Sequence, residues 1–142
     1  MARTGVNFTI RADRNTLARL ETRRRRGGES KARLAHRYIV EGMEMEDHPG
    51  IVFRDGAGGR RPGLAGGPDV WQVIGVLKGS EKKREAAISH AAEWLSIRPD
   101  QVRAAVSYYG QHQREIDEWI RRNDEEAEAA EAAWRREQEL LA

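Results

Sequence analysis

Apolar and polar side chains alternate close to the start of the chain. The apolar positions of this segment are Val6, Phe8 and Ile10, and the polar positions are Asn7, Thr9 and Arg11. A repeat of two residues is typical of a β-strand with one buried side and one side in water. We therefore predict a single short strand over residues 6–11.

A helical pattern replaces the alternation after residue 12. Asp13 is a suitable N-cap for a first helix, and Arg23–Arg26 followed by Gly27 and Gly28 form a typical C-terminal end. Ser30 is a suitable N-cap for a second helix. Apolar residues recur at helical spacing in both segments: Leu17 and Leu20 in the first, and Leu34, Ala35, Tyr38 and Ile39 in the second.

Residues 48–68 are rich in glycine and contain Pro49 and Pro62. Such a composition is typical of turns, and the short apolar segment at residues 51–53 favours a small hairpin or turn within it. We place a domain boundary near residue 48. Residues 1–47 then form one domain, and residues 48–68 form a hinge.

Helical periodicity returns at Asp69 and continues to the C-terminus. Three amphipathic helices are predicted to begin near Asp69, Glu81 and Pro99. The turn at residues 96–98 is short, which favours a helix-turn-helix-like domain over residues 69–112. Residues 113–142 keep the helical pattern but are rich in alanine and carboxylates. The predicted fold class is mainly α, with one N-terminal strand per chain and an acidic C-terminal helix.

The charges are unevenly distributed, although the net charge is only +2. Residues 1–40 contain eleven Arg or Lys and three Asp or Glu, whereas residues 113–142 contain ten Asp or Glu and five Arg. A basic head and an acidic tail suggest two different partners.

The sequence lacks the residues that several kinds of catalytic and metal-binding site require. The absence of cysteine excludes disulfides, thiol catalysis and cysteine-based zinc sites. Among the four histidines, we identify a metal-ligand spacing on one helix face only for His90 with Glu93, and two ligands make a weak site. Residues 56–61 lack the Lys-Ser/Thr ending of a phosphate loop. We expect no enzyme, no metal and no cofactor.

The sequence also bears on localisation. The longest apolar run, residues 73–77, is too short to cross a bilayer. The first residues have no signal-peptide pattern. We expect a cytoplasmic protein.

With their order of strand, helix, glycine and helix, residues 5–45 resemble the ribbon-helix-helix DNA-binding proteins of the Arc, MetJ and CopG kind. The resemblance implies an intertwined homodimer in which the strands of two chains pair and enter the major groove. Asn7, Thr9 and Arg11 would then contact bases, since arginine matches guanine and asparagine matches adenine. The alternative is a strand of another small mixed fold, with the arginine run as a solvated helix end.

The same resemblance implies two further sets of residues. Phosphate contacts are expected from the start of the second helix and from nearby cations, namely Arg3, Arg23, Arg24, Arg25, Arg26, Ser30 and Lys31. A dimer core is expected from Val6, Phe8, Ile10, Leu17, Leu20, Leu34, Tyr38 and Ile39. Dimerisation also follows on physical grounds, because so small a unit has a thin core and an unpaired strand edge.

The second half of the chain resembles a bacterial family of small domains of unknown function, numbered four-three-three, whose members often look like antitoxins. The similarity is found in residues 64–71, in residues 99–109 with their tyrosine pair, and in Glu115–Ile116. The resemblance implies a helix-turn-helix-like core. This core either reads DNA through Gln101, Arg103 and Ser107 or is a platform for the tail. Residues 41–112 carry nine basic and ten acidic side chains, which favours the platform.

The acidic C-terminal helix is predicted to bind a protein partner in a groove. Its anchors would be Trp119, Ile120, Trp134, Leu140 and Leu141. A solvent-exposed helix stabilised by neighbouring charges, or a weak coiled coil between two copies, are the alternatives.

Taken together, the resemblances imply a VapB-like antitoxin of a type II toxin–antitoxin system. Such a protein would bind an inverted repeat in its own operator DNA as a homodimer and neutralise a cognate toxin, expected to be a PIN-type ribonuclease. One alternative is a stand-alone regulator whose C-terminal half only oligomerises. Another is a protein adaptor that binds no DNA.

Overall fold

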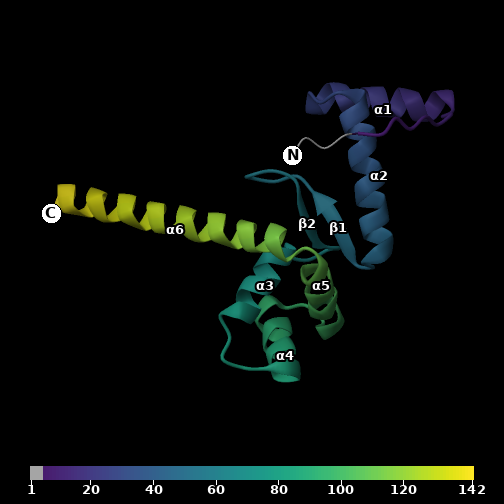
Figure 1. Cartoon of the computed structure of the whole chain (residues 1–142). Helices are drawn as coiled ribbons and strands as arrows, with labels where there is room; N and C mark the ends of the chain where they lie inside the picture. Colours follow the sequence, from purple (N-terminus) through teal and green to yellow (C-terminus); the bar gives the residue numbers. More distant parts are fainter. Residues whose placement is uncertain (1–4) are drawn as a thin grey trace. The chain divides into compact units, whose positions relative to one another are not determined.

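The computed structural model describes residues 5–142, which form six helices and one antiparallel sheet of two strands (Figure 1). The elements are α1 (Arg14–Gly27), α2 (Lys31–Asp47), β1 (Ile51–Arg54), β2 (Arg61–Leu64), α3 (Val70–Lys78), α4 (Arg84–Leu95), α5 (Pro99–Gln111) and α6 (Gln113–Leu141). The predicted mainly helical class is confirmed. None of the helices in the described part is long and apolar enough to cross a membrane.

Contacts divide the chain into two units, Met1–Gly42 (unit 1) and Met43–Ala142 (unit 2). The division falls inside α2, whereas the sequence suggested a boundary after the end of this helix. The last turn of α2 belongs to unit 2 because Glu44 contacts His112, far along the chain.

In unit 1, local hydrogen bonds begin and end the helices as the sequence predicted. The Asp13 carboxylate accepts from the backbone N–H of Thr16 at 2.8 Å, which caps α1. Gly28 ends α1 with φ of 71°, a conformation that favours glycine, and its N–H donates to the Arg24 carbonyl. At α2, the Ser30 hydroxyl accepts from the N–H of Arg33 at 3.2 Å. Residues 5–13 belong to no helix or strand.

In unit 2, the glycine-rich segment forms the predicted hairpin. Ile51 pairs with Leu64, and Arg54 pairs with Arg61. The Arg54 guanidinium joins the hairpin to the start of α3 through Asp69 at 2.9 Å and through the carbonyls of Leu64 and Gly67. The core of unit 2 draws on both strands and on α3 to α6. It comprises Ile51, Leu64, Val70, Val73, Ile74, Ala91, Ala92, Val102, Ala105, Tyr108 and Ile116.

Helix α6 is anchored at its N-terminal end and continues well beyond α3 and α5 (Figure 1). Ile116 is fully buried in the core, and Lys78 of α3 pairs with Asp117 at 2.6 Å. From residue 123 onward the side chains are exposed, apart from the half-buried Ala133. The first turns of α6 are therefore part of the folded unit, and the later turns form a solvated extension.

Candidate functional site

The N-terminal segment exposes its apolar side chains in the single chain. Val6 is 92% exposed, Phe8 76% and Ile10 64%. The polar residues Asn7, Thr9 and Arg11 are exposed as well. The predicted strand needs the same segment of a second copy for its hydrogen bonds, so it stays a prediction.

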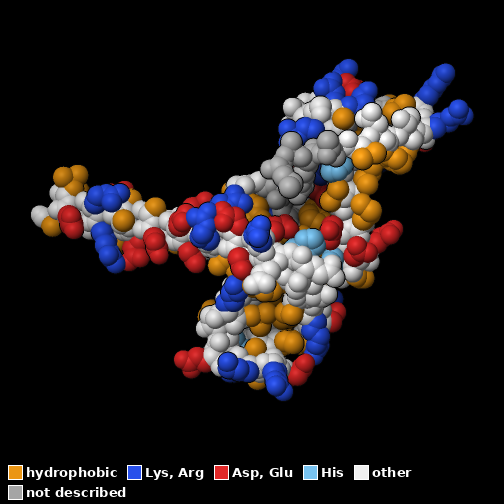
Figure 2. All heavy atoms as spheres, in the orientation of Figure 1, with side chains coloured by type: hydrophobic (Ala, Val, Ile, Leu, Met, Phe, Trp, Pro, Cys, Tyr) orange, Lys and Arg blue, Asp and Glu red, His pale blue; other side chains and the backbone are white. Residues whose placement is uncertain are grey.

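The helices of unit 1 leave further apolar surface uncovered. Helix α1 has no buried residue: Leu17 is exposed and Leu20 is half-buried. In α2, Leu34 is buried at 1% exposure, while Tyr38 and Ile39 are each about two-fifths exposed. Figure 2 shows hydrophobic side chains at the surface of α2. Of the eight residues expected to form a dimer core, one is buried in the single chain.

The arginine run at the end of α1 is partly neutralised by one carboxylate. Both nitrogens of an Arg24 fork bind Glu21, at 3.0 and 2.6 Å, and Arg25 binds it at 3.2 Å. The hydrogen bonds from Arg24 lower the pKa of Glu21 to about 2, so it stays charged at neutral pH. Arg23 and Arg26 project exposed side chains.

The start of α2 presents Ser30 and Lys31, both exposed. The adjacent Glu29 forms an ion pair with Arg37 at 2.5 Å, so its charge is compensated within unit 1. Lys31 lies 3.8 Å from Glu21. Arg3, the remaining residue expected to contact phosphate, lies outside the described residues.

Helix α5 offers few cations that are not already paired. Arg103 binds Glu85 of α4 at 2.6 Å, and Arg98 binds Asp100 at 3.1 Å. Gln101 accepts from the backbone N–H of Arg98 and so caps the helix. These local roles support a platform more than a second surface for phosphates.

Two of the five residues expected to bind a partner also pack on their own unit. Trp119 lies beneath the guanidinium groups of Arg61 and Arg122, at 5.0 and 4.1 Å from its ring centre. Ile120 packs against the core of unit 2. Both side chains are half-buried, so their expected contact with a partner stays a prediction. The sequence does not reveal that the first turns of α6 pack on the rest of the unit.

The other three residues expected to bind a partner lie in the exposed part of α6. Trp134 is 59% exposed, Leu140 86% and Leu141 79%. Ion pairs one helical turn apart stabilise this extension, as between Arg135 and Glu131 at 2.5 Å. The extension is helical in the single chain, and its large apolar side chains are exposed.

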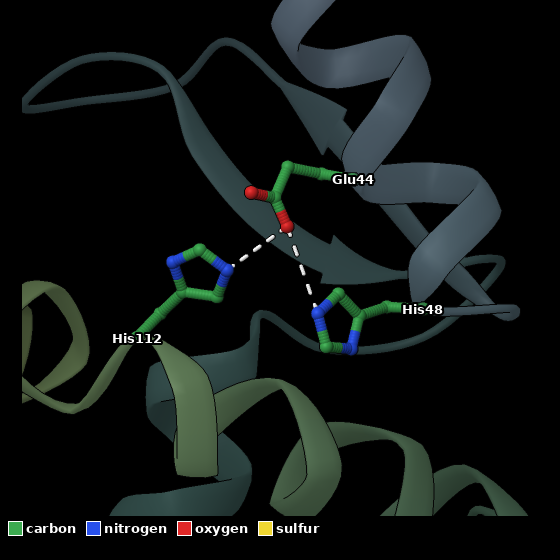
Figure 3. Close-up of side chains that lie close together, drawn as sticks. All are labelled: Glu44, His48 and His112. Atoms are coloured by element: carbon green, nitrogen blue, oxygen red, sulfur yellow. Dashed lines mark hydrogen bonds and ion pairs between the residues drawn. The ribbon is translucent and has the colours of Figure 1, made fainter.

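A cluster that the sequence did not suggest lies in unit 2 (Figure 3). Glu44 comes from the last turn of α2, His48 follows that helix, and His112 separates α5 from α6. Their side chains point toward one another: Glu44 Oε2 lies 2.9 Å from His112 Nε2 and 3.6 Å from His48 Nε2. We call this the Glu44–His48–His112 cluster.

Tyr108 and Glu115 complete the surroundings of this cluster. The Tyr108 ring stacks on His112 with centroids 4.2 Å apart and meets His48 edge-on at 5.1 Å. Its hydroxyl donates to Glu115 at 3.1 Å. Burial raises the pKa of Glu115, and the hydrogen bond from Tyr108 opposes this shift.

One sequence signal for the cluster was present. Glu44 and His48 are four residues apart, the spacing of neighbours on one helix face. His112 had no such signal, because only the packing of α5 and α6 brings it to the end of α2. His90 and Glu93, which have a similar spacing, gain no third ligand among the described residues.

Searches among models of protein families, curated proteins and solved structures found no match to this chain.

Proposed function

We propose that the chain is a dimeric, sequence-specific DNA-binding protein that pairs with a second copy through unit 1. The observation that carries the proposal is the exposure of Val6, Phe8 and Ile10 next to a helix, α1, with no buried residue. An isolated unit of about forty residues without disulfides usually needs oligomerisation or a metal to be stable. A second copy that pairs with residues 6–11 would cover this apolar surface and satisfy the backbone of the segment.

The proposed pairing puts the polar side of the segment outward. Asn7, Thr9 and Arg11 alternate with the apolar residues, so burial of one set leaves the other in water. A two-stranded ribbon fits the major groove, where these side chain types match base edges. Affinity would come from phosphate contacts of the α1 arginines and of Ser30 and Lys31 at the start of α2.

The C-terminal extension is the proposed partner-binding element. Trp134, Leu140 and Leu141 are large apolar residues on an otherwise acidic helix, a combination that suits a groove on a basic protein. With the resemblances described above, this supports an antitoxin that represses its own operator and neutralises a toxin, with a PIN-type ribonuclease as the expected toxin. A stand-alone regulator whose extension only oligomerises is the second candidate, and the ion-paired solvated helix favours it.

A gel-shift experiment on the DNA upstream of the gene tests the DNA assignment. The triple variant Asn7→Ala, Thr9→Ala, Arg11→Ala should lose specific binding, with non-specific competitor present. A matched triple variant in α5, Gln101→Ala, Arg103→Ala, Ser107→Ala, should retain it. Specific binding by the first variant, or its loss only in the second, would overturn the ribbon assignment.

Sedimentation velocity tests the dimer separately. Phe8→Glu places a charge at a position that the proposed dimer buries, and should shift the protein toward a monomer and weaken DNA binding. Thr9→Glu changes the neighbouring outward position and should leave the dimer intact. A Phe8→Glu protein that remains dimeric would contradict the proposed pairing.

Burial along α6 indicates which C-terminal truncation leaves the core of unit 2 intact. Removal of residues 113–142 would take away the buried Ile116, so a chain that ends at Glu126 is the better variant. It should keep DNA binding and lose protection against the product of the adjacent gene. Protection by the shortened chain would contradict the assignment of toxin binding to the extension.

A further inference from the structure

We propose that Glu44, His48 and His112 form a binding site for a transition-metal ion, with Zn²⁺ as the best match. The site is independent of the proposed DNA and partner surfaces, because none of its three residues belongs to them. The sequence led us to expect no metal.

The geometry of the cluster is close to that of a metal site. One ligand atom from each residue can be chosen so that all three lie within 4.8 Å of one another. A tetrahedral ion with bonds of about 2.0–2.1 Å keeps its ligand atoms about 3.3 Å apart. The distances of 2.9 and 3.6 Å from Glu44 to the two imidazoles lie on either side of this value. Small side-chain rotations would therefore allow all three to bind one ion.

His48 provides an independent indication of a ligand-binding site. Its side chain is only 2% exposed, yet neither ring nitrogen has a hydrogen-bond partner. Buried polar atoms without a partner are rare in folded proteins and often mark an ion or water site. His48 Nε2 faces Glu44 and the rest of the cluster (Figure 3), so an ion there would satisfy it.

Glu115 is placed as an outer partner of a metal-bound His112. Its Oε2 lies 3.7 Å from His112 Nδ1, on the other side of the ring from Glu44. Histidine ligands usually donate their second N–H to a carboxylate, which orients the ring. The hydrogen bond from Tyr108 holds Glu115 there, and the stacked Tyr108 ring restricts His112.

The donor set selects the class of metal. Two imidazoles and one carboxylate suit Zn²⁺ and other transition metals, whereas Mg²⁺ and Ca²⁺ prefer oxygen ligands alone. Three protein ligands leave one position of a tetrahedral ion for water or a further ligand. A bound ion would join the last turn of α2 to the junction of α5 and α6.

The test uses full-length protein without an affinity tag, treated with a chelator that is then removed. Titration with Zn²⁺ should show one ion per chain, and Co²⁺ should give the visible absorption of a tetrahedral site. His112→Gln and Glu44→Gln should each weaken Zn²⁺ binding by about 100-fold or more, because each removes a direct ligand. Glu115→Gln should weaken it by about 10-fold, as is typical of an outer partner.

His90→Gln is the matched control, because it changes a histidine outside the cluster and should leave the affinity unchanged. Circular dichroism without metal verifies that each variant is folded. NMR of the histidine rings in the unaltered protein should show Zn²⁺-dependent shifts at His48 and His112, a result that needs no variant. The absence of stoichiometric binding, equal affinity of the His112→Gln protein, or ring shifts confined to other histidines would overturn the proposal.

Discussion

Replacement of Ile116 with alanine tests how α6 is attached to unit 2. Ile116 has no exposed surface and contacts the core near the start of the helix. The substitution removes about three methylene-sized groups at about 0.8 kcal/mol each, or about 2.4 kcal/mol. The cavity left behind raises the expected loss in unfolding free energy to about 3–5 kcal/mol. This is a large part of the 5–15 kcal/mol that stabilises a typical domain.

Urea unfolding followed by circular dichroism and tryptophan fluorescence measures this loss. The midpoint should fall with little change in slope, because the exposed surface of the unfolded chain is nearly the same. Leu140→Ala removes a similar amount of apolar side chain from a position that is 86% exposed, and should change stability by less than about 0.5 kcal/mol. A loss below about 1 kcal/mol in the Ile116 variant would refute the docking of α6 through this residue.

Three further perturbations test other contacts of unit 2. Hydrogen bonds from Lys78 and Tyr109 lower the pKa of Asp117 in the folded protein. The interaction of Asp117 with these two residues should therefore stabilise the fold at pH values above the unfolded pKa of about 3.9. This stabilisation should be lost as the pH falls through the lower pKa of the folded state. An NMR titration of the carboxylate measures this, and Lys78→Met should raise its midpoint. Arg54→Met removes a charged pair and two carbonyl contacts, and thermal unfolding should show a loss of about 2 kcal/mol. Gly58→Ala should cost about 1–2 kcal/mol in the same assay, since φ is +86° there and the new Cβ would lie 3.3 Å from the Trp119 ring.

Helix positions were largely predictable because their signals are local. The caps at Asp13 and Ser30 involve residues three positions away, and Pro99 begins α5 as proline does in many helices. The glycine-rich segment likewise predicted the hairpin. Each of these signals is formed by residues that are close together in the sequence, so it can be recognised without knowledge of the tertiary structure.

The features that the sequence did not reveal depend instead on contacts between distant segments. Trp119 and Ile120 have the same helical spacing as the exposed Trp134, and only the packing of α6 on α3 and the hairpin distinguishes them. His112 becomes a neighbour of Glu44 and His48 through that packing as well. Contacts between distant segments leave no periodic pattern in either segment.

By itself, the sequence determined the helical class, the caps and turns, the hairpin, and the separation of a basic head from an acidic tail, because these follow from local backbone preferences and composition. Only the tertiary structure showed which part of α6 packs on the core and which part is exposed to solvent. The Glu44–His48–His112 cluster is likewise visible only in the tertiary structure. The physical reason is that burial and ligand geometry depend on distances between elements, which the folding of the whole unit sets.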